Sequence, residues 1–297
     1  MTRSLAAVAA ALTIAGSLQA QPPGITREMI MRQLPEEGAP LGVVGPHRTI
    51  MEAAAGSAEH AVYRPETLAA GEKLPIFVWG NGGCARNSGG FANYLNTIAS
   101  YGYLVVTTAA PEGVTGSATA DDLRKGLDWA FAEAGRSGSP LSGKVDTDKV
   151  AVMGVSCGGV MTLGLAGDPR VDTIGVFNSG VSAPGAGSGI PGNPTSEILK
   201  TIHGPTLYLD GAEADFMTPV AKANFEAIDH VPIFYGSRDN AGHSATYFHA
   251  NGGEFANVTV AWLNWQLKGD ESAAKMFRGA DCTLCTNPTW ETDSKGL

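Results

Sequence analysis

The sequence predicts an α/β domain with a mostly parallel central sheet and helices on both faces. Short apolar runs alternate with segments of helical periodicity from Val62 to Leu267, which is the pattern of parallel strands joined by crossover helices. The runs are apolar at consecutive positions, as expected of strands that are buried on both faces. The 39 glycines among 297 residues indicate many tight turns and close backbone approaches, which are typical of a loop-rich enzyme of this class.

The expected strands and helices follow from these runs in chain order. Strands are predicted over residues 74–79, 103–107, 150–155, 173–177, 206–209 and 232–235. Helices are predicted over residues 91–101, 120–134, 160–165, 218–228 and 255–267, with a further helical pattern near Glu197. The connection from Gly180 to Pro194 is long and rich in Gly, Pro and Ser. We expect it to overhang the carboxyl edge of the sheet, where ligands bind in such folds.

Residues 1–20 have the pattern of a secretory signal peptide. Arg3 supplies the positive charge, residues 5–14 form an apolar segment too short to cross a bilayer, and small or polar residues follow as far as Ala20. Cleavage after Ala20 or after Ser17 fits the pattern, and a buried N-terminal helix is the alternative interpretation. A signal peptide predicts a secreted or periplasmic protein in an oxidising compartment.

The rest of the chain is predicted to be an arm followed by the domain. Residues 21–45 are rich in Pro and Gly without a clear period and are interpreted as an N-terminal arm. Residues 46–297 form the domain and end in a tail that carries a C-x-x-C pair. The formal net charge of −9 argues against nucleic acid or an anionic membrane as a partner. No later segment is apolar enough to span a membrane, and we expect a monomer.

Ser156 is the predicted nucleophile. It lies in Gly154-Val-Ser-Cys-Gly158, which matches the G-x-S-x-G elbow. The motif follows the apolar run 150–155 and precedes the helical pattern 160–165, so the serine is placed on a sharp turn from strand to helix. Glycines are needed two positions to either side because larger side chains would collide across this turn. A Gly-rich turn with an idle serine is the alternative.

His243 is the predicted base. A serine hydroxyl needs a histidine to take its proton, and a carboxylate must orient that histidine. In folds with this elbow the order is serine, acid, histidine, each following a strand. Among the histidines after Ser156, His203 and His230 precede strands and so stand at the wrong edge of the sheet. His243 follows a strand in a turn, and His249 is the alternative.

Asp215 is the predicted acid. The strand 206–209 leads into Asp210-Gly-Ala-Glu-Ala-Asp215, and Asp215 stands in the loop just ahead of Thr218, where the next helix begins. Asp210 and Glu213 are the alternative acids. Asp215 could also serve only as a cap of the following helix.

Gly83 and Cys157 are predicted to donate the N–H groups of an oxyanion hole. Acyl transfer forms a negative oxygen that preorganised donors stabilise. One donor is normally the residue after the nucleophile, here Cys157. The other comes from the loop after the early strand, here Gly80-Asn-Gly-Gly-Cys84, in which Gly82 lets the backbone approach the substrate. An ordinary Gly-rich connection is the alternative.

Two disulfides are predicted, Cys282–Cys285 and Cys84–Cys157. The chain has 4 cysteines, which should pair after export. Cys282 and Cys285 are close enough in sequence to close a small ring. Cys84 and Cys157 are far apart in sequence, but two N–H groups aimed at one oxygen lie within about 5 Å of each other. That places the neighbouring Cα atoms within disulfide range. Two free buried thiols are the alternative for this second pair.

The segments around these residues resemble a known group of enzymes. Val145-Asp-Thr-Asp-Lys-Val-Ala-Val-Met-Gly-Val-Ser-Cys-Gly-Gly159 resembles the elbow of secreted dienelactone-hydrolase-like α/β hydrolases, a broad group that includes cutinase-like polyester (PET) hydrolases. Residues 81–88 and 98–106 are similar to the oxyanion loop of those enzymes and to the helix and strand after it. Residues 207–219 and Gly242-His243 continue the similarity.

The resemblance covers roughly residues 60–270 and implies the α/β-hydrolase fold. The site residues that it implies are a triad and two oxyanion donors: Ser156, Asp215, His243, Gly83 and Cys157.

Three features differ from the polyester hydrolases. Those enzymes usually carry an aromatic residue or histidine before the nucleophile and methionine after it, where this chain has Val155 and Cys157. Gly83 replaces their aromatic oxyanion residue. No tryptophan stands between Val181 and Asn193, where they place one against an aromatic ester. These differences favour general ester hydrolysis over polyester hydrolysis.

The sequence therefore predicts a serine carboxylic-ester hydrolase that acts on a small or polymeric ester through an acyl-enzyme. A polyester or cutin-type hydrolase, an acyltransferase and an exopeptidase could use the same triad. A non-catalytic binding module is disfavoured because all three catalytic residue types are present in order. No cofactor or metal is expected, since no histidine pair has ligand spacing and the segment from Cys282 to Cys285 lacks a second C-x-x-C.

Overall fold

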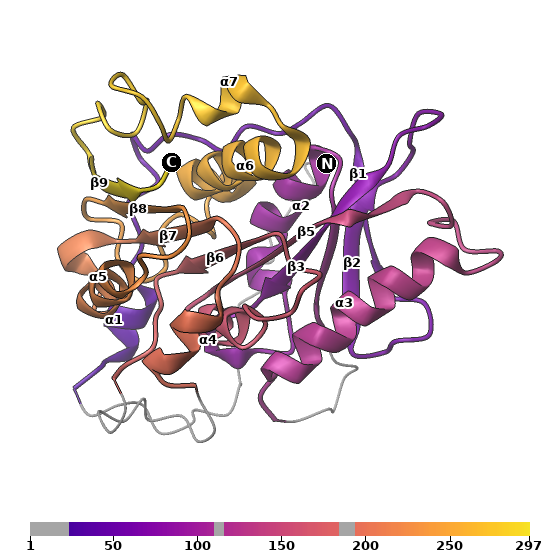
Figure 1. The fold of residues 1–297 in the computed structure, drawn as a ribbon, viewed down its shortest axis with the longest axis horizontal. Helices are drawn as coiled ribbons and strands as arrows, with labels where there is room; N and C mark the ends of the chain where they lie inside the picture. Colours follow the sequence, from indigo (N-terminus) through magenta and orange to yellow (C-terminus); the bar gives the residue numbers. More distant parts are fainter. Residues whose placement is uncertain (1–23, 110–115, 184–193) are drawn as a thin grey trace, which may run out of the picture.

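The computed structural model describes residues 24–109, 116–183 and 194–297 (Figure 1). The predicted signal peptide, and residues 184–193 of the connection that we expect to overhang the sheet, lie outside the described residues. The strands are β1 (Thr49–Ala53), β2 (His60–Pro65), β3 (Leu74–Gly80), β4 (Leu104–Thr108), β5 (Val145–Val155), β6 (Thr173–Phe177), β7 (Thr206–Asp210), β8 (Ile233–Arg238) and β9 (Trp290–Lys295). The α-helices are α1 (Arg27–Met31), α2 (Ala92–Ser100), α3 (Ala120–Gly135), α4 (Cys157–Leu163), α5 (Thr218–Ala227), α6 (Gly253–Lys268) and α7 (Glu271–Ala274).

Within these residues the strands form one 9-stranded sheet in the order β1-β2-β4-β3-β5-β6-β7-β8-β9. The six strands β4, β3, β5, β6, β7 and β8 are parallel. β1, β2 and β9 pair antiparallel at the two ends. This confirms the predicted mostly parallel sheet, and it is the arrangement of an α/β hydrolase.

Helices cover both faces of the sheet, as predicted (Figure 1). Side chains alternate along β3, so that Ile76 and Val78 join the core on one face while Phe77 and Trp79 join the core on the other. Helices α3, α4 and α5 pack on the first of these cores, and α2 and α6 pack on the second. The carboxyl ends of the parallel strands are therefore held between two layers of helices.

The differences from the sequence prediction lie mainly at the edges. The helical pattern near Glu197 is a 3₁₀-helix, Ser196–Thr201. The periodless arm contains the short helix α1. β9 was not predicted, because only Trp290 of this strand is buried and the rest has no apolar run. An edge strand with one covered side does not need the apolar pattern of a central strand. No helix in the described parts of the chain is long and apolar enough to cross a membrane.

Candidate active site

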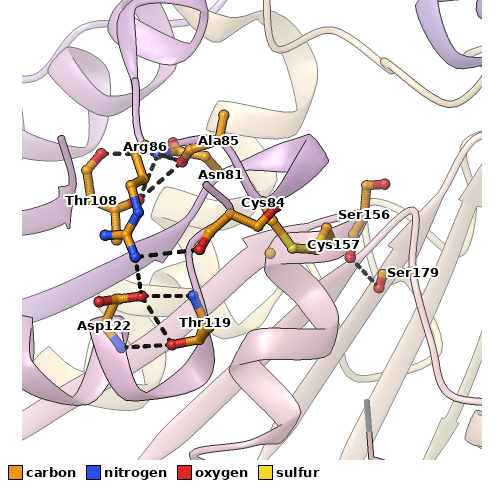
Figure 2. The surroundings of a disulfide bond; sticks show 12 residues. Asn81, Cys84, Ala85, Arg86, Thr108, Thr119, Asp122, Ser156, Cys157 and Ser179 are labelled. Carbon is orange, nitrogen blue, oxygen red and sulfur yellow. Dashed lines mark hydrogen bonds and ion pairs between the residues drawn. A yellow bond between two sulfur atoms is a disulfide. The ribbon is translucent and has the colours of Figure 1, made fainter. Parts of the chain in front are cut away.

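Ser156 lies on the sharp turn between β5 and α4. Its backbone has φ 55° and ψ −122°, a region that non-glycine residues rarely adopt. The turn is tight because a Cβ on Gly158 would collide with the Gly80 carbonyl oxygen, which is why the motif requires glycine. The Ser156 N–H donates to the Phe177 carbonyl at 2.8 Å. The Ser179 hydroxyl donates to the Ser156 carbonyl at 2.6 Å (Figure 2). The end of β6 thus holds the strained residue in place.

The structure brings Ser156, His243 and Asp215 into one hydrogen-bonded line. His243 Nδ1 lies 2.8 Å from Asp215 Oδ1, and His243 Nε2 lies 2.9 Å from Ser156 Oγ. A carboxylate only accepts, so Nδ1 carries the proton and Nε2 accepts from the serine hydroxyl. His243 and Asp215 are buried, whereas Ser156 is only partly so. The ring of Phe216 stacks on the imidazole with centroids 4.2 Å apart. This geometry suits transfer of the serine proton to histidine.

Asp215 is kept ionised by the donors around it. Burial raises the pKa of Asp215, but the hydrogen bond and charge of His243 and the donors Met217 N–H and Asn178 Nδ2 outweigh burial and hold the pKa below its ordinary value. Met217 N–H donates to Oδ1 at 3.0 Å and Asn178 Nδ2 donates to Oδ2 at 2.8 Å. Asp215 therefore receives donors on both oxygens, which fixes the carboxylate plane.

Asn178 and Tyr247 belong to this network and were not predicted from the sequence. The Tyr247 hydroxyl donates to Asn178 Oδ1 at 2.8 Å, which turns the amide nitrogen toward Asp215 and the Gly242 carbonyl. Burial raises the pKa of Tyr247 well above its ordinary value, so its hydroxyl stays a donor. Asn178 directly follows β6 with φ 46°, a conformation that asparagine tolerates. A polar residue at the carboxyl end of an apolar run was the sequence signal for it.

The alternative acids and base lie elsewhere. Asp210 is buried and accepts from Tyr235, Ser237 and the Ala212 N–H. Burial raises the pKa of Asp210, and the Asp215 charge raises it further, although these donors partly compensate. The carboxyl of Glu213 is exposed. The third alternative, His249, donates through Nε2 to a backbone carbonyl in the arm at 2.8 Å. None of the three has a hydrogen bond to the residues of the line.

The two predicted oxyanion donors lie on adjacent turns. Cys157 is the first residue of α4, so its N–H has no acceptor within the helix. Gly83 lies in the turn after β3 with φ 63°. Neither N–H donates a hydrogen bond among the described residues. The flanking Cα atoms of Cys84 and Cys157 are 5.2 Å apart. Two free donors on neighbouring turns provide what a developing oxyanion requires.

Polar side chains anchor the loop that carries Gly83 (Figure 2). Asn81 Nδ2 donates to the carbonyls of Ala85 and Thr108, each at 3.1 Å. Arg86 Nη2 donates to Asp122 Oδ2 at 2.8 Å, and that carboxylate also caps the first turn of α3. Burial raises the pKa of Asp122, but its hydrogen bonds and the Arg86 charge outweigh this and lower it. The oxyanion loop is therefore tied to β4 and α3.

Both predicted disulfides are present in the structure. Cys84–Cys157 joins the oxyanion loop to the first residue of α4 (Figure 2), across a sequence separation of 73. Cys282–Cys285 closes a ring with a separation of 3. The first bond thus links the two turns that carry the candidate oxyanion donors.

We predict that removing Cys84–Cys157 destabilises the protein more than removing Cys282–Cys285. Crosslinking a loop of 73 residues lowers the entropy of the unfolded chain and so stabilises the folded protein by about 4 kcal/mol. The corresponding stabilisation for Cys282–Cys285, with a separation of 3 residues, is about 2 kcal/mol. The double variants Cys84→Ala/Cys157→Ala and Cys282→Ala/Cys285→Ala form a matched pair, compared by urea unfolding. Equal losses of unfolding free energy in the two variants would contradict the prediction.

One of the comparisons with known proteins assigns the chain to a family. Among curated proteins none matches the chain. The family model of the PETase family, described as PET hydrolase-like, matches residues 42–292. Within the described parts of the chain no three His, Cys, Asp or Glu side chains are grouped closely enough to hold a metal ion.

The match to the family model covers the sheet from β1 to the start of β9 and every residue of the hydrogen-bonded line, and the chain therefore belongs to the PET hydrolase-like family of α/β hydrolases.

Proposed function

We propose that this protein is a secreted serine hydrolase that cleaves carboxylic esters through an acyl-enzyme. The observation that carries the proposal is the unbroken line from Ser156 Oγ through His243 to Asp215, with distances of 2.9 Å and 2.8 Å. The family match supports ester hydrolysis as the reaction class. The line supplies the nucleophile, the base and the orienting carboxylate that this chemistry needs.

The first half of the proposed reaction forms the acyl-enzyme. Ser156 Oγ attacks the ester carbonyl carbon while His243 Nε2 takes the hydroxyl proton. The negative oxygen that results is stabilised by the N–H groups of Gly83 and Cys157. His243 then gives the proton to the alcohol oxygen as that bond breaks. The ionised Asp215 stabilises the imidazolium that exists between these two transfers.

The second half returns the serine. Water enters where the alcohol has left, His243 removes its proton, and the resulting hydroxide equivalent attacks the acyl carbon. The same two N–H groups stabilise the second tetrahedral oxygen. Collapse of this intermediate releases the acid, and His243 returns the proton to Ser156 Oγ. The cycle is complete with residues of this chain and one water.

Polyester hydrolysis is the second candidate function, and the PET hydrolase-like match favours it. Small esters remain the first candidate because of the residue at position 83. A Cβ placed on Gly83 would meet no atom within 4 Å, so this chain leaves open the space that a larger oxyanion residue would fill. Open space beside the oxyanion accepts varied acyl groups without holding an aromatic ring in one orientation.

Export and a monomeric state are part of the proposal. The two disulfides support an oxidising compartment, either extracellular or periplasmic. The signal-like sequence of residues 1–20 points the same way.

The test is labelling by a fluorophosphonate probe combined with a panel of nitrophenyl esters from acetate to palmitate and an aromatic polyester film. The proposal expects stoichiometric labelling, hydrolysis of at least one nitrophenyl ester, and activity that persists in EDTA. Release of an aromatic acid from the film would support polyester hydrolysis as a further activity. A folded protein that is neither labelled nor active on any ester would overturn the proposal.

A further inference from the structure

The N-terminal arm packs directly on the loop that carries His243. Two segments are involved: the docking segment, residues 30–36, and the histidine loop, residues 239–250. The family model matches the chain from residue 42, so the docking segment precedes the matched residues. It nevertheless contacts the histidine loop directly, because Gln33 forms a parallel bridge with Ala245.

Three hydrogen bonds join the docking segment to the residues immediately after His243. The Ser244 N–H donates to the Arg32 carbonyl at 2.8 Å. The Ser244 hydroxyl donates to the Ile30 carbonyl, also at 2.8 Å. The Leu34 N–H donates in the opposite direction, to the Ala245 carbonyl at 3.0 Å. The backbone that carries the imidazole is therefore bonded to the arm at the next two positions along the chain.

The arm also holds the far end of the histidine loop. His249 Nε2 donates to the Leu34 carbonyl at 2.8 Å, and both residues are buried. The Ala250 N–H donates to Glu36 Oε1 at 3.1 Å. The docking segment thus spans the loop from the residue after the imidazole to its C-terminal end. The buried His249 therefore has a structural function and does not act as the alternative base.

The histidine loop needs such support because its backbone is strained. Asn240, Gly242 and Ala245 have φ values of 58°, 69° and 42°. Positive φ costs free energy in residues with a Cβ and persists only where the surroundings hold it. At Gly242, next to His243, the Arg32 backbone and side chain lie so close that any Cβ would collide with them. The arm is therefore fitted to the strained turn itself.

Leu34 anchors the docking segment in the core. Its side chain is only 8% exposed and belongs to the same buried cluster as Ala245 and Tyr247. Leu41, further along the arm, is 61% exposed. The two leucines therefore provide a buried anchor and an exposed control within one arm.

We propose that the docking segment is a positioning element for His243, and that Leu34 is the residue that holds it there. This inference rests on the proposed function, because it assigns the arm a role in placing the base. The imidazole must keep Nε2 on the serine and Nδ1 on Asp215 at the same time. A shift of the loop by a fraction of an ångström breaks that double contact, and small misplacements cost large factors in rate.

The test compares Leu34→Ala with Leu41→Ala in the full chain. Leu34→Ala should lower kcat for nitrophenyl acetate about tenfold with KM changed less than twofold, at a temperature where the variant is fully folded. Leu41→Ala should match the wild type, and Leu34→Met should restore most of the kcat. In Leu34→Ala the far-downfield proton resonance of the His243 Nδ1–H should broaden or shift. If Leu34 were only a structural anchor, Leu34→Ala would lower Tm and leave kcat and this resonance unchanged.

Two further measurements cover the case in which Leu34→Ala does not fold. Ser244→Ala removes one side-chain hydrogen bond to the arm and should lower kcat severalfold without a change in KM. In the wild type, the amides of Leu34 and Ser244 should exchange with deuterium as slowly as the core strands. Rapid exchange at both amides, or equal kcat in all folded variants of an active enzyme, would overturn the inference. A wild type inactive on every ester and unlabelled by fluorophosphonate would instead overturn the proposed function, and the exchange result would still report on docking.

Discussion

Replacing Ser156 by alanine is expected to abolish ester hydrolysis, with a loss of about 10⁴-fold or more in kcat. The hydroxyl lies 2.9 Å from His243 Nε2, and among the described residues no other side chain is hydrogen-bonded to this nitrogen. The neighbouring Ser179 hydroxyl donates to the Ser156 carbonyl and so has its oxygen turned to the backbone (Figure 2). Turnover of a nitrophenyl ester by the purified variant measures the loss.

The matched control for this variant is Ser179→Ala. It should keep most of the activity, although it loses one hydrogen bond to the elbow backbone. Both proteins should unfold near the temperature of the wild type, because neither change opens a large cavity. Ser156→Ala with turnover close to the wild type would exclude Ser156 as the nucleophile.

Asp215→Asn is expected to lower kcat about 10⁴-fold, because no orientation of the new amide satisfies its neighbours. In the carboxylate, Oδ1 accepts from His243 and from the Met217 N–H, while Oδ2 accepts from Asn178 Nδ2. An amide nitrogen facing His243 would meet its Nδ1–H and favour the wrong tautomer. An amide nitrogen on the other side would meet the Asn178 amide nitrogen. Either placement sets two donors against each other.

Glu213→Gln is the control for the acid, since it makes the same chemical change two residues earlier on an exposed side chain. Its kcat should stay within about twofold of the wild type, because exposed carboxylates contribute little. Parallel measurement of kcat and KM for the two variants decides between the carboxylates. If Glu213→Gln were the more damaging change, the acid would have to be reassigned to Glu213.

The central strands and the chemistry-bearing turns could be predicted from the sequence. Buried parallel strands require consecutive apolar residues, so β3 to β8 leave a clear pattern. The glycines around Ser156 are required by backbone contacts that the motif encodes. The order of Ser156, Asp215 and His243 along the chain follows from where strands end, and the structure places the three in one line.

The unpredicted features depend on contacts between distant segments. Asn178 reaches Asp215 only because β6 and β7 are neighbours in the sheet. The docking of the arm uses mainly backbone groups, such as the Arg32 carbonyl, and these leave no mark in the side-chain pattern. β9 pairs through its backbone as well, with a largely exposed sequence. Backbone hydrogen bonds between segments far apart in the chain are thus the part of the fold that residue types do not reveal.

The C-terminal strand β9 determines which strand forms this edge of the sheet. β9 covers the outer edge of β8 over residues 233–238, and without it the N–H and C=O groups of β8 would form an open template for strands of other molecules. Lys295 Nζ fastens the strand by donating to the carbonyls of Phe225, Glu226 and Ile228 at the end of α5. At its other end, Trp290 Nε1 donates to Glu254 at 2.7 Å. The sheet therefore ends in β9, a strand with several charged residues, and not in the apolar β8. Charged edge strands pair poorly with other chains, so removing β9 is expected to make the protein more prone to aggregation.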